Sequence, residues 1–237
     1  MHAEIAERLL QVNREFYQSF ARPFAETRRR LQPGAAQAVR ELPPPAAVLD
    51  LGCGSGEVAR ALARRGHRGA YLGIDQCDTL LDEALSSGLA QAEFLLADLA
   101  DPGWPELTHP PYAYALAFAV LHHLPGADRR SEFAASVRRL LEPQGVFVFS
   151  VWQFQTSERL RRRIVPWQSI GLEDKQVDPG DHLLDWRHGG RGLRYVHAFE
   201  DTELEDLARE AGWHRMRTYF ADGQGGRLGR YEVWSAP

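Results

Sequence analysis

Three glycines at every second position, Gly52, Gly54 and Gly56, follow an acidic residue, Asp50, in the segment Val48–Glu57. Because glycine lacks a Cβ atom, the main chain there can take positive φ angles, and a ligand can lie directly against it. The spacing differs from the Gly-x-Gly-x-x-Gly pattern of dinucleotide-binding domains. An acid beside the loop would repel a phosphate and attract an ammonium group. The segment therefore predicts a site for a cationic ligand that carries no phosphate.

Two further acids end apolar runs: Asp75 follows residues 70–74 and Asp98 follows residues 93–97. In a parallel sheet the carboxyl ends of the strands open on one crevice. Asp75 stands about 20 residues after the glycine loop, where the ribose-binding acid of a doubly wound sheet is found. Together with Asp50, these acids predict a crevice for a ligand that has a nucleoside and a positive charge.

A histidine pair, His122 and His123, directly follows another apolar run, residues 113–119. If that run is the next strand, the pair lies where two reactants bound in the crevice would meet. At neutral pH a histidine serves equally as a hydrogen-bonded scaffold residue or as a residue that contacts ligand. Both roles stay open for each histidine.

The elements that must position these residues alternate between strand and helix. A helix-forming segment, residues 57–65, follows the glycine loop at once, and residues 131–141 form an amphipathic helix. Strands are predicted over residues 48–51, 70–74, 93–97, 113–119, 146–152, 215–221 and 231–235. This order predicts an α/β fold, a doubly wound, mostly parallel seven-stranded sheet with a C-terminal hairpin, in one domain of residues 1–237.

Two segments lie outside this alternation. Residues 3–31 are predicted to be helical with an interruption near Pro23, within an N-terminal helical extension of residues 1–45. Residues 153–193 have no clear pattern and are predicted to be an insertion that binds the second of the two reactants. Four arginines lie among residues 159–163. A solvated helix face explains such a run, and contact with phosphates is the functional alternative.

The composition, 44% hydrophobic and 25% charged in 237 residues, is that of an ordinary globular chain. No apolar run reaches the roughly 18 residues of a membrane span, and no signal-peptide core is present, which predicts a cytoplasmic protein. The net charge of −4 argues against a generally basic nucleic-acid binder, although local patches can contact phosphates. Cys53 and Cys77 are too few for a disulfide framework and lack partners for a zinc site, so no metal is expected.

The pattern Asp-x-Gly-x-Gly-x-Gly of residues 50–56, with Asp75 and Asp98, resembles class I S-adenosylmethionine-dependent methyltransferases. The resemblance implies S-adenosyl-L-methionine as cofactor, with the glycines along its methionine and ribose. It also implies that Asp75 binds the ribose hydroxyls and that Asp98 faces the adenine amino group. The N-terminal helix would form a lid, from which Arg28 pairs with the methionine carboxylate. The remaining cofactor contacts that it implies are Tyr17, Gln76, Leu99 and Ala119.

Other segments resemble a narrower family, the tRNA wobble-uridine carboxymethyl methyltransferases. The resemblance is carried by residues 20–28, 119–124 with 129–130, 151–155, 165–167 and 194–199. That family methylates the carboxylate of 5-carboxymethyluridine in the anticodon loop. The resemblance thus implies tRNA as a partner and allows a small zinc-binding activator subunit. The chain departs from the family at Gln32, where the family has tryptophan, and at residues 224–227, which replace a Gly-Asn-Trp segment.

A carboxylate acceptor is already ionised at neutral pH, so its methylation needs alignment and an anion site but no catalytic base. Under this hypothesis Arg194 orients the carboxylate and Trp152 or Trp167 stacks on the base, although core packing explains both tryptophans equally well. The residues expected at the acceptor are His122, His123, Trp152, Trp167, Arg194, Tyr195 and His197.

Two rival functions also fit the sequence. In the first, the enzyme methylates a small metabolite such as a phenol, a quinone precursor or a free acid. His122 or His123 would then be a general base, and the insertion would form a closed apolar pocket. In the second, the chain is a regulatory protein that binds S-adenosylmethionine without turnover.

Overall fold

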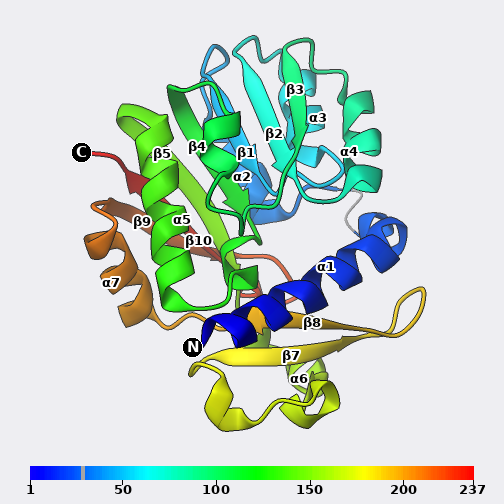
Figure 1. Ribbon diagram of the computed structural model, residues 1–237. Coiled ribbons are helices and arrows are strands. Elements are labelled where there is room, and N and C mark those ends of the chain that lie inside the picture. The colour runs from blue at the N-terminus through cyan, green and yellow to red at the C-terminus, as the bar shows by residue number, and fades with distance from the viewer. Residues whose placement is uncertain (28–29) are drawn as a thin grey trace.

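The computed structural model describes residues 1–27 and 30–237 and has a seven-stranded sheet at its centre (Figure 1). The strands follow the order β3-β2-β1-β4-β5-β10-β9. All neighbours from β3 to β5 pair in parallel, whereas β10 is antiparallel to both β5 and β9. Their bounds are β1 (Val48–Leu51), β2 (Tyr71–Asp75), β3 (Ala92–Leu96), β4 (Tyr112–Phe118), β5 (Leu141–Trp152), β9 (His214–Ala221) and β10 (Gly229–Ser235). The predicted fold class is confirmed.

Helices cover both faces of this sheet because successive residues of each buried strand point to opposite sides. Phe147 and Phe149 of β5 face a cluster that includes α5 and α7, whereas Val148 between them joins a cluster with α2 and α3. The helices are α2 (Pro33–Glu41), α3 (Glu57–Arg64), α4 (Asp78–Ala84), α5 (Ala127–Leu140) and α7 (Asp201–Glu210). α5 begins four residues before the predicted start at Ser131.

A second, smaller sheet lies within and just after the predicted insertion. Its strands are β6 (Ile164–Val165), β7 (Asp181–Trp186) and β8 (Gly192–His197), all antiparallel, and α6 (Glu158–Arg161) precedes them. The sequence predicted no regular elements in residues 153–193, because β6 is short and long loops separate it from β7. Short 3₁₀ helices are η1 (Leu85–Ser87), η2 (Trp104–Leu107), η3 (Leu121–His123), η4 (Phe154–Thr156), η5 (Trp167–Ile170) and η6 (Asp174–Gln176).

Helix α1 (Ala3–Glu26) lies along β8 of the small sheet (Figure 1). Leu9 of α1 packs with Leu183 and Tyr195 in a core of its own. We call α1 and the small sheet the cap. The predicted interruption near Pro23 takes the form of a kink at Phe20, where φ is −122° and ψ is 18°. Proline lacks an N–H, and its ring collides with the carbonyl four residues earlier, which distorts the turn before it. No helix among the described residues is both long and apolar enough to cross a bilayer.

Candidate functional site

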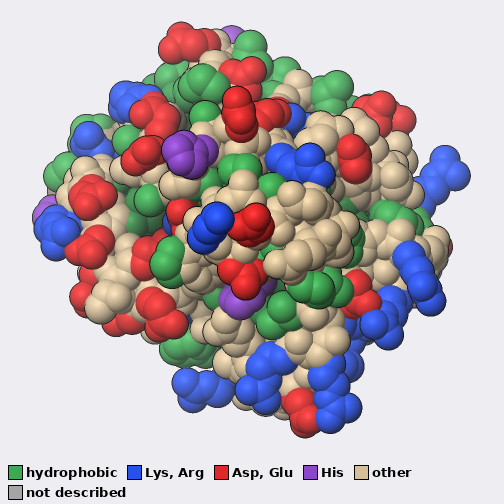
Figure 2. Space-filling view, turned by 60° about the horizontal axis from the view of Figure 1, so that its bottom comes forward, with side chains coloured by type: hydrophobic (Ala, Val, Ile, Leu, Met, Phe, Trp, Pro, Cys, Tyr) green, Lys and Arg blue, Asp and Glu red, His purple; other side chains and the backbone are tan. Residues whose placement is uncertain are grey.

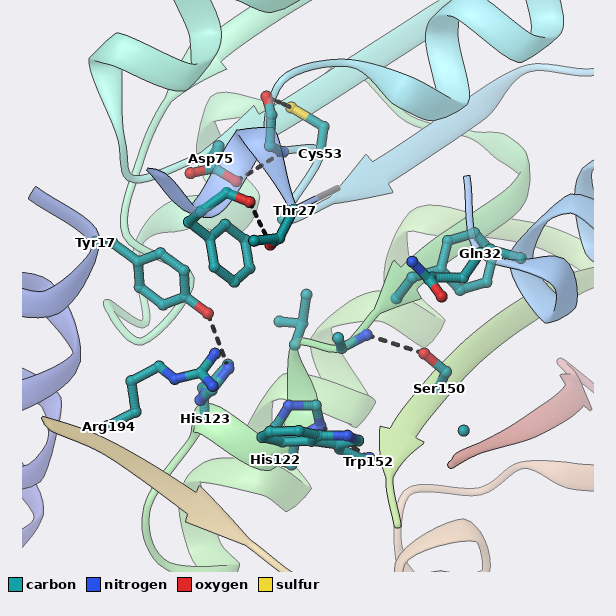
Figure 3. A pocket seen from close by; sticks show the side chains of 18 of the residues that line it. Tyr17, Thr27, Gln32, Cys53, Asp75, His122, His123, Ser150, Trp152 and Arg194 are labelled. Carbon is teal, nitrogen blue, oxygen red and sulfur yellow. Dashed lines mark hydrogen bonds between the residues drawn. The ribbon is translucent and has the colours of Figure 1, made fainter. Parts of the chain in front are cut away.

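A cavity of about 720 Å³ lies between the carboxyl ends of the central strands and the cap. Its size falls within the range of small-molecule sites, roughly 300–1,000 Å³. The sheet-side lining comes from the glycine loop and from the segments after β2, β3 and β4, and the cap-side lining comes from α1, β7 and β8 (Figure 3). The strand order reverses between β1 and β4, which is where open α/β sheets bind their ligands.

The glycine loop adopts backbone angles that other residues avoid. Gly52, Gly54 and Gly56 have φ angles of +72°, +53° and +82°. A Cβ atom at Gly52 would lie 2.4 Å from Val120 Cγ2, whereas one at Gly54 would meet no atom within 4 Å. Gly52 and Gly54 line the cavity, and the open space at Gly54 lets a ligand approach the backbone. Gly56 does not line the cavity, since it packs against Ala84 of α4.

Asp75 at the end of β2 is oriented by two backbone amides. Gly54 N donates to Asp75 Oδ2 at 2.8 Å, and Cys77 N donates to Oδ1 at 3.0 Å (Figure 3). Burial raises the pKa of Asp75, and these N–H donors oppose the shift by stabilising the carboxylate. The side chain both fixes the glycine loop and lines the cavity, with Gln76 beside it.

Asp50 lies deeper, in the middle of β1, where it is 2% exposed. Its Oδ2 accepts the hydroxyl of Tyr71 at 2.5 Å. Burial raises the pKa of Asp50 to about 7 against this hydrogen bond, and the charge of Asp75 adds to the shift. Asp50 lines the cavity, so a cationic ligand would favour its ionised form.

Asp98, after β3, joins the central sheet to the cap. Arg14 of α1 donates from Nε to Asp98 Oδ2 at 2.8 Å, and Ala100 N donates to Oδ1 at 2.9 Å. Asp98 and Leu99 both line the cavity. The two oxygens of Asp98 already accept hydrogen bonds, so any ligand amino group there would share them.

The segment after β4 turns sharply into the cavity. Ala119 has a φ of +60°, uncommon for a residue with a side chain, and its N–H donates to Ser150 Oγ at 3.0 Å (Figure 3). The turn delivers His122 and His123 to the cavity wall.

Hydrogen bonds identify the tautomers of the two histidines. His123 Nδ1 lies 3.0 Å from the carbonyl oxygen of Tyr195, which can only accept. The amide nitrogen of Asn13, 3.3 Å from Nδ1, donates to the carbonyl oxygens of Tyr195 and His123, so we assign the hydrogen to Nδ1. His123 Nε2 then accepts the Tyr17 hydroxyl at 3.0 Å. His122 Nδ1 accepts the backbone N–H of Trp152 at 3.3 Å, which places the hydrogen of the neutral ring on Nε2. The acceptor nitrogen of each neutral ring is therefore engaged by a donor of the protein.

Arg194 of β8 is enclosed by aromatic rings. Its guanidinium carbon lies 4.9 Å from the ring centre of Phe16, 5.1 Å from Trp186, 5.3 Å from Trp152 and 6.0 Å from Phe24. Such contacts attract the cation to the ring faces and restrict its movement. Arg194 is 5% exposed and lines the cavity, where it supplies a fixed positive charge. Trp152 also lines the cavity.

Two of the expected acceptor residues, Trp167 and Tyr195, lie away from the cavity. Trp167 is buried in the core of the cap beside Leu183. Tyr195 directly follows Arg194 in β8, so its side chain points to the opposite face of the strand. There its hydroxyl donates to Asp181 at 2.7 Å. The structure corrects the expectation that these two side chains contact the acceptor.

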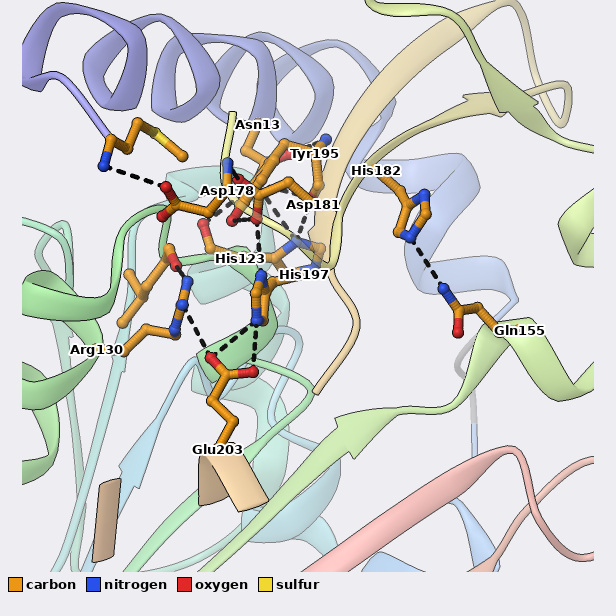
Figure 4. Close-up of polar contacts among 12 residues, drawn as sticks. Asn13, His123, Arg130, Gln155, Asp178, Asp181, His182, Tyr195, His197 and Glu203 are labelled. Carbon is orange, nitrogen blue, oxygen red and sulfur yellow. Dashed lines mark hydrogen bonds and ion pairs between the residues drawn. The ribbon is translucent and has the colours of Figure 1, made fainter. Parts of the chain in front are cut away.

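His197 is likewise buried in a polar cluster outside the cavity (Figure 4). Its Nδ1 lies 2.7 Å from Asp181 Oδ1 and its Nε2 lies 2.9 Å from Glu203, which also pairs with Arg130. Burial alone would lower the pKa of His197, but the hydrogen bonds to Asp181 and Glu203 outweigh it and raise the pKa. The cluster joins β7 and β8 to α5 and α7, a structural role in place of the expected substrate contact.

Replacing His197 therefore tests a structural role. His197→Ala leaves the buried Asp181 carboxylate without this partner, and the free energy of unfolding should fall by about 3–5 kcal/mol. The exposed His214→Ala is the matched control, with an expected change below about 0.5 kcal/mol. Urea denaturation of both variants measures the difference. Equal stability of the two variants would contradict this role.

Asn13 of α1 was not singled out from the sequence. It is 3% exposed, and its side chain pairs with both backbone groups of Tyr195: Oδ1 accepts the N–H at 2.9 Å and Nδ2 donates to the carbonyl at 3.2 Å. It thereby fixes β8 next to Arg194. A polar residue between Leu9 and Phe16 on the apolar side of an amphipathic helix was the available signal. Arg28 lies outside the described residues.

The chain is similar in sequence to known proteins. Residues 21–215 match the family model described as a methyltransferase domain. A tRNA (carboxymethyluridine(34)-5-O)-methyltransferase of Schizosaccharomyces pombe is 25% identical over 218 residues, which cover 84% of this chain and 86% of that protein. A protein of the same name from Arabidopsis thaliana is 28% identical over 196 residues, and the match spans 79% of this chain but only 44% of the relative.

The fold also matches solved structures. A protein from Methanosarcina mazei, described as a SAM-dependent methyltransferase, superposes with a TM-score of 0.65. Its sequence is 22% identical, and the match covers 87% of this chain and 98% of the other. This likeness shows the shared fold.

Proposed function

The chain belongs to the methyltransferase domain family, and we propose that it methylates the carboxylate of 5-carboxymethyluridine at the wobble position of tRNA. As a class I S-adenosylmethionine-dependent methyltransferase, it takes the methyl group from that cofactor. The Schizosaccharomyces pombe and Arabidopsis thaliana relatives, both named tRNA (carboxymethyluridine(34)-5-O)-methyltransferase, support the choice of acceptor. The residues that line the cavity support the cofactor and the acceptor on physical grounds.

The residues at the sheet side of the cavity fit the cofactor. The open backbone at Gly54 accommodates a ligand, and Asp75 is held by two amides with its remaining lone pairs able to accept ribose hydroxyls. The carboxyl group of Asp50 can balance the positive charge of the methionine portion. When bound, S-adenosylmethionine supplies an electrophilic methyl group on its sulfonium.

The observation that carries the choice of acceptor is Arg194, a fixed guanidinium in the same cavity. Guanidinium groups bind carboxylates through two parallel hydrogen bonds, which fix both position and orientation. Trp152, beside Arg194, supplies a surface on which the uracil ring can stack. Orientation is the main requirement of this reaction, because effective molarity rises steeply when reacting atoms are aligned.

The histidines support the same choice. A phenol or an amine would need to lose a proton, and a histidine could accept it only through an unprotonated ring nitrogen. In His123 that nitrogen accepts the Tyr17 hydroxyl, and in His122 it accepts the Trp152 N–H. A carboxylate needs no such base at neutral pH. We propose that His123 positions Tyr17 at the cavity.

Nucleoside analysis tests the proposed function. The protein is incubated with tRNA that carries 5-carboxymethyluridine and with S-adenosylmethionine labelled in its methyl group. The label should appear in a methyl ester of that nucleoside, which mild base hydrolyses. Label that resists base, on a ring atom or a ribose, would contradict the proposal.

The raised pKa of Asp50 predicts that cofactor binding depends on pH. Its carboxyl group is neutral below about pH 7 and negative above it, and only the negative form attracts the cationic cofactor. Affinity for S-adenosylmethionine should therefore rise about tenfold between roughly pH 6 and pH 8. Calorimetry at several pH values measures it. Asp50→Asn is the control and should remove this dependence; the same pH profile in both proteins would refute the role of Asp50.

A further inference from the structure

Of the arginines on and just after α6, two line the cavity and two lie on the outer surface. Arg159 of α6, which is exposed, and Arg163, two residues after the helix ends, both line the cavity. Arg162 forms an ion pair with Glu158 on the outer side, where the two side chains are 77% and 67% exposed. Arg161 is exposed and does not line the cavity. The run of arginines thus contains a pair directed toward the site and a pair directed toward solvent.

The cavity-facing pair has no acidic partner in the described part of the chain. Within residues 1–27 and 30–237, no carboxylate oxygen lies within 4.0 Å of a side-chain nitrogen of Arg159 or Arg163. The carboxylates that line the cavity have other partners: backbone amides for Asp75, Arg14 for Asp98, Tyr231 for Asp222, Tyr71 for Asp50 and Arg60 for Glu57. Two positive charges that the protein leaves unbalanced at a cavity raise the local concentration of anions.

Arg163 is hydrogen-bonded to the small sheet that contains Arg194, but its backbone is two strands away from that of Arg194. Asp185 N donates to the Arg163 carbonyl at 2.9 Å. In the small sheet Ile164 pairs with Leu184, and Leu184 pairs with Arg194. Adjacent strands lie about 4.8 Å apart, so the backbone beside Arg163 is about 10 Å from that of Arg194. A ligand that carries two separate anionic groups can use Arg194 and this pair together.

We propose that Arg159 and Arg163 bind the sugar–phosphate backbone next to the acceptor nucleotide, so that the substrate is an RNA strand and not a free nucleoside. The inference rests on the proposed function, which places the acceptor carboxylate at Arg194. The planar guanidinium fork matches the oxygens of a phosphate as well as those of a carboxylate. A free modified nucleoside has no phosphate and would occupy the Arg194 site alone.

Basic side chains gather on part of the surface although the chain as a whole is acidic. The chain has a formal net charge of −4, yet its charges are unevenly placed. On the face shown in Figure 2, Lys and Arg side chains gather along the lower and right-hand margins, whereas Asp and Glu side chains predominate on the left. An acidic protein can therefore offer a basic path to RNA.

The test compares two double variants in binding to an unmodified anticodon stem-loop oligonucleotide. Arg159→Gln with Arg163→Gln removes the cavity-facing pair, and Arg161→Gln with Arg162→Gln is the matched control. Affinity is measured between about 50 and 200 mM salt. The first variant should bind at least about tenfold more weakly. Its slope of log K against log salt should be smaller by about 1.4, since each phosphate contact in a single strand contributes about 0.7. The control should bind like the wild type.

Equal losses in the two variants, or no loss in the cavity-facing variant, would overturn the inference. Unchanged affinity for S-adenosylmethionine in both variants shows that the cavity is intact. Binding of the unmodified oligonucleotide does not depend on methyl transfer, so the two proposals can fail separately. If wild-type protein forms no methyl ester, the proposed function fails. If the cavity-facing variant forms the ester with an unchanged KM for the RNA, the proposed function holds and the proposal that Arg159 and Arg163 bind phosphate is wrong.

Discussion

Arg194→Ala should lower kcat/KM for methylation of carboxymethyluridine-containing tRNA by about 10²–10³, because it removes the group that orients the acceptor carboxylate. The affinity for S-adenosylmethionine should stay unchanged, since the glycine loop, Asp50 and Asp75 belong to the sheet side of the cavity. Steady-state kinetics with the modified tRNA and calorimetry with the cofactor measure the two quantities separately.

Arg194→Lys serves as the matched variant. It keeps the positive charge among the aromatic rings but loses the planar fork, so its activity should lie between those of the wild type and the alanine variant. Normal methyl transfer by Arg194→Ala would show that the acceptor carboxylate binds elsewhere. An equal loss of cofactor affinity would show that Arg194 supports the whole cavity and not only the acceptor.

The second large effect is expected at Asp75. In Asp75→Asn, one of the amides of Gly54 and Cys77 would face an NH₂ group in place of a carboxylate oxygen. The glycine loop would lose part of its support, and the ribose would lose an acceptor. Affinity for S-adenosylmethionine and for its demethylated product should both fall by about a hundredfold, equivalent to about 3 kcal/mol.

Asp82→Asn controls for the loss of a negative charge near the site, because Asp82 is exposed on the neighbouring helix α4. Its affinity for both ligands should match that of the wild type. If Asp75→Asn binds the cofactor like this control, the carboxylate does not contact the ribose and the glycine loop does not need it.

The sheet side of the cavity could be predicted from local patterns. The glycine loop requires positive φ angles, and Asp75 is the last residue of β2, so both signals lie within a few neighbouring residues. Such signals are independent of the rest of the fold. The same holds for the α/β class, which follows from the alternation of strands and helices.

The cap could not be predicted in the same way, because its contacts join distant parts of the chain. Asn13 and Tyr195 are 182 positions apart, and Phe16, Trp152 and Trp186 reach Arg194 from three different elements. No local pattern brings these residues together.

Of the residues expected in the segment 194–199, Arg194 lines the cavity, whereas Tyr195 and His197 do not. The expected contacts at Tyr195 and His197 came from the resemblance of a whole segment, residues 194–199. The alternation of a strand already separates Arg194 from Tyr195 and His197, since neighbouring residues point to opposite faces. Applied to residues 194–199, this rule would have left Arg194 as a candidate contact of the acceptor and would have placed Tyr195 and His197 on the opposite, buried face. The buried hydrogen bonds of Tyr195 and His197 to Asp181 agree with that assignment.

The most direct test of the central claim compares two anticodon stem-loops in single-turnover reactions at saturating cofactor. One carries 5-carboxymethyluridine and the other carries the corresponding uncharged amide. A cavity that holds a carboxylate on Arg194 should methylate the acid and leave the amide unmethylated. Transfer to the amide at a rate similar to that of the acid would contradict the account.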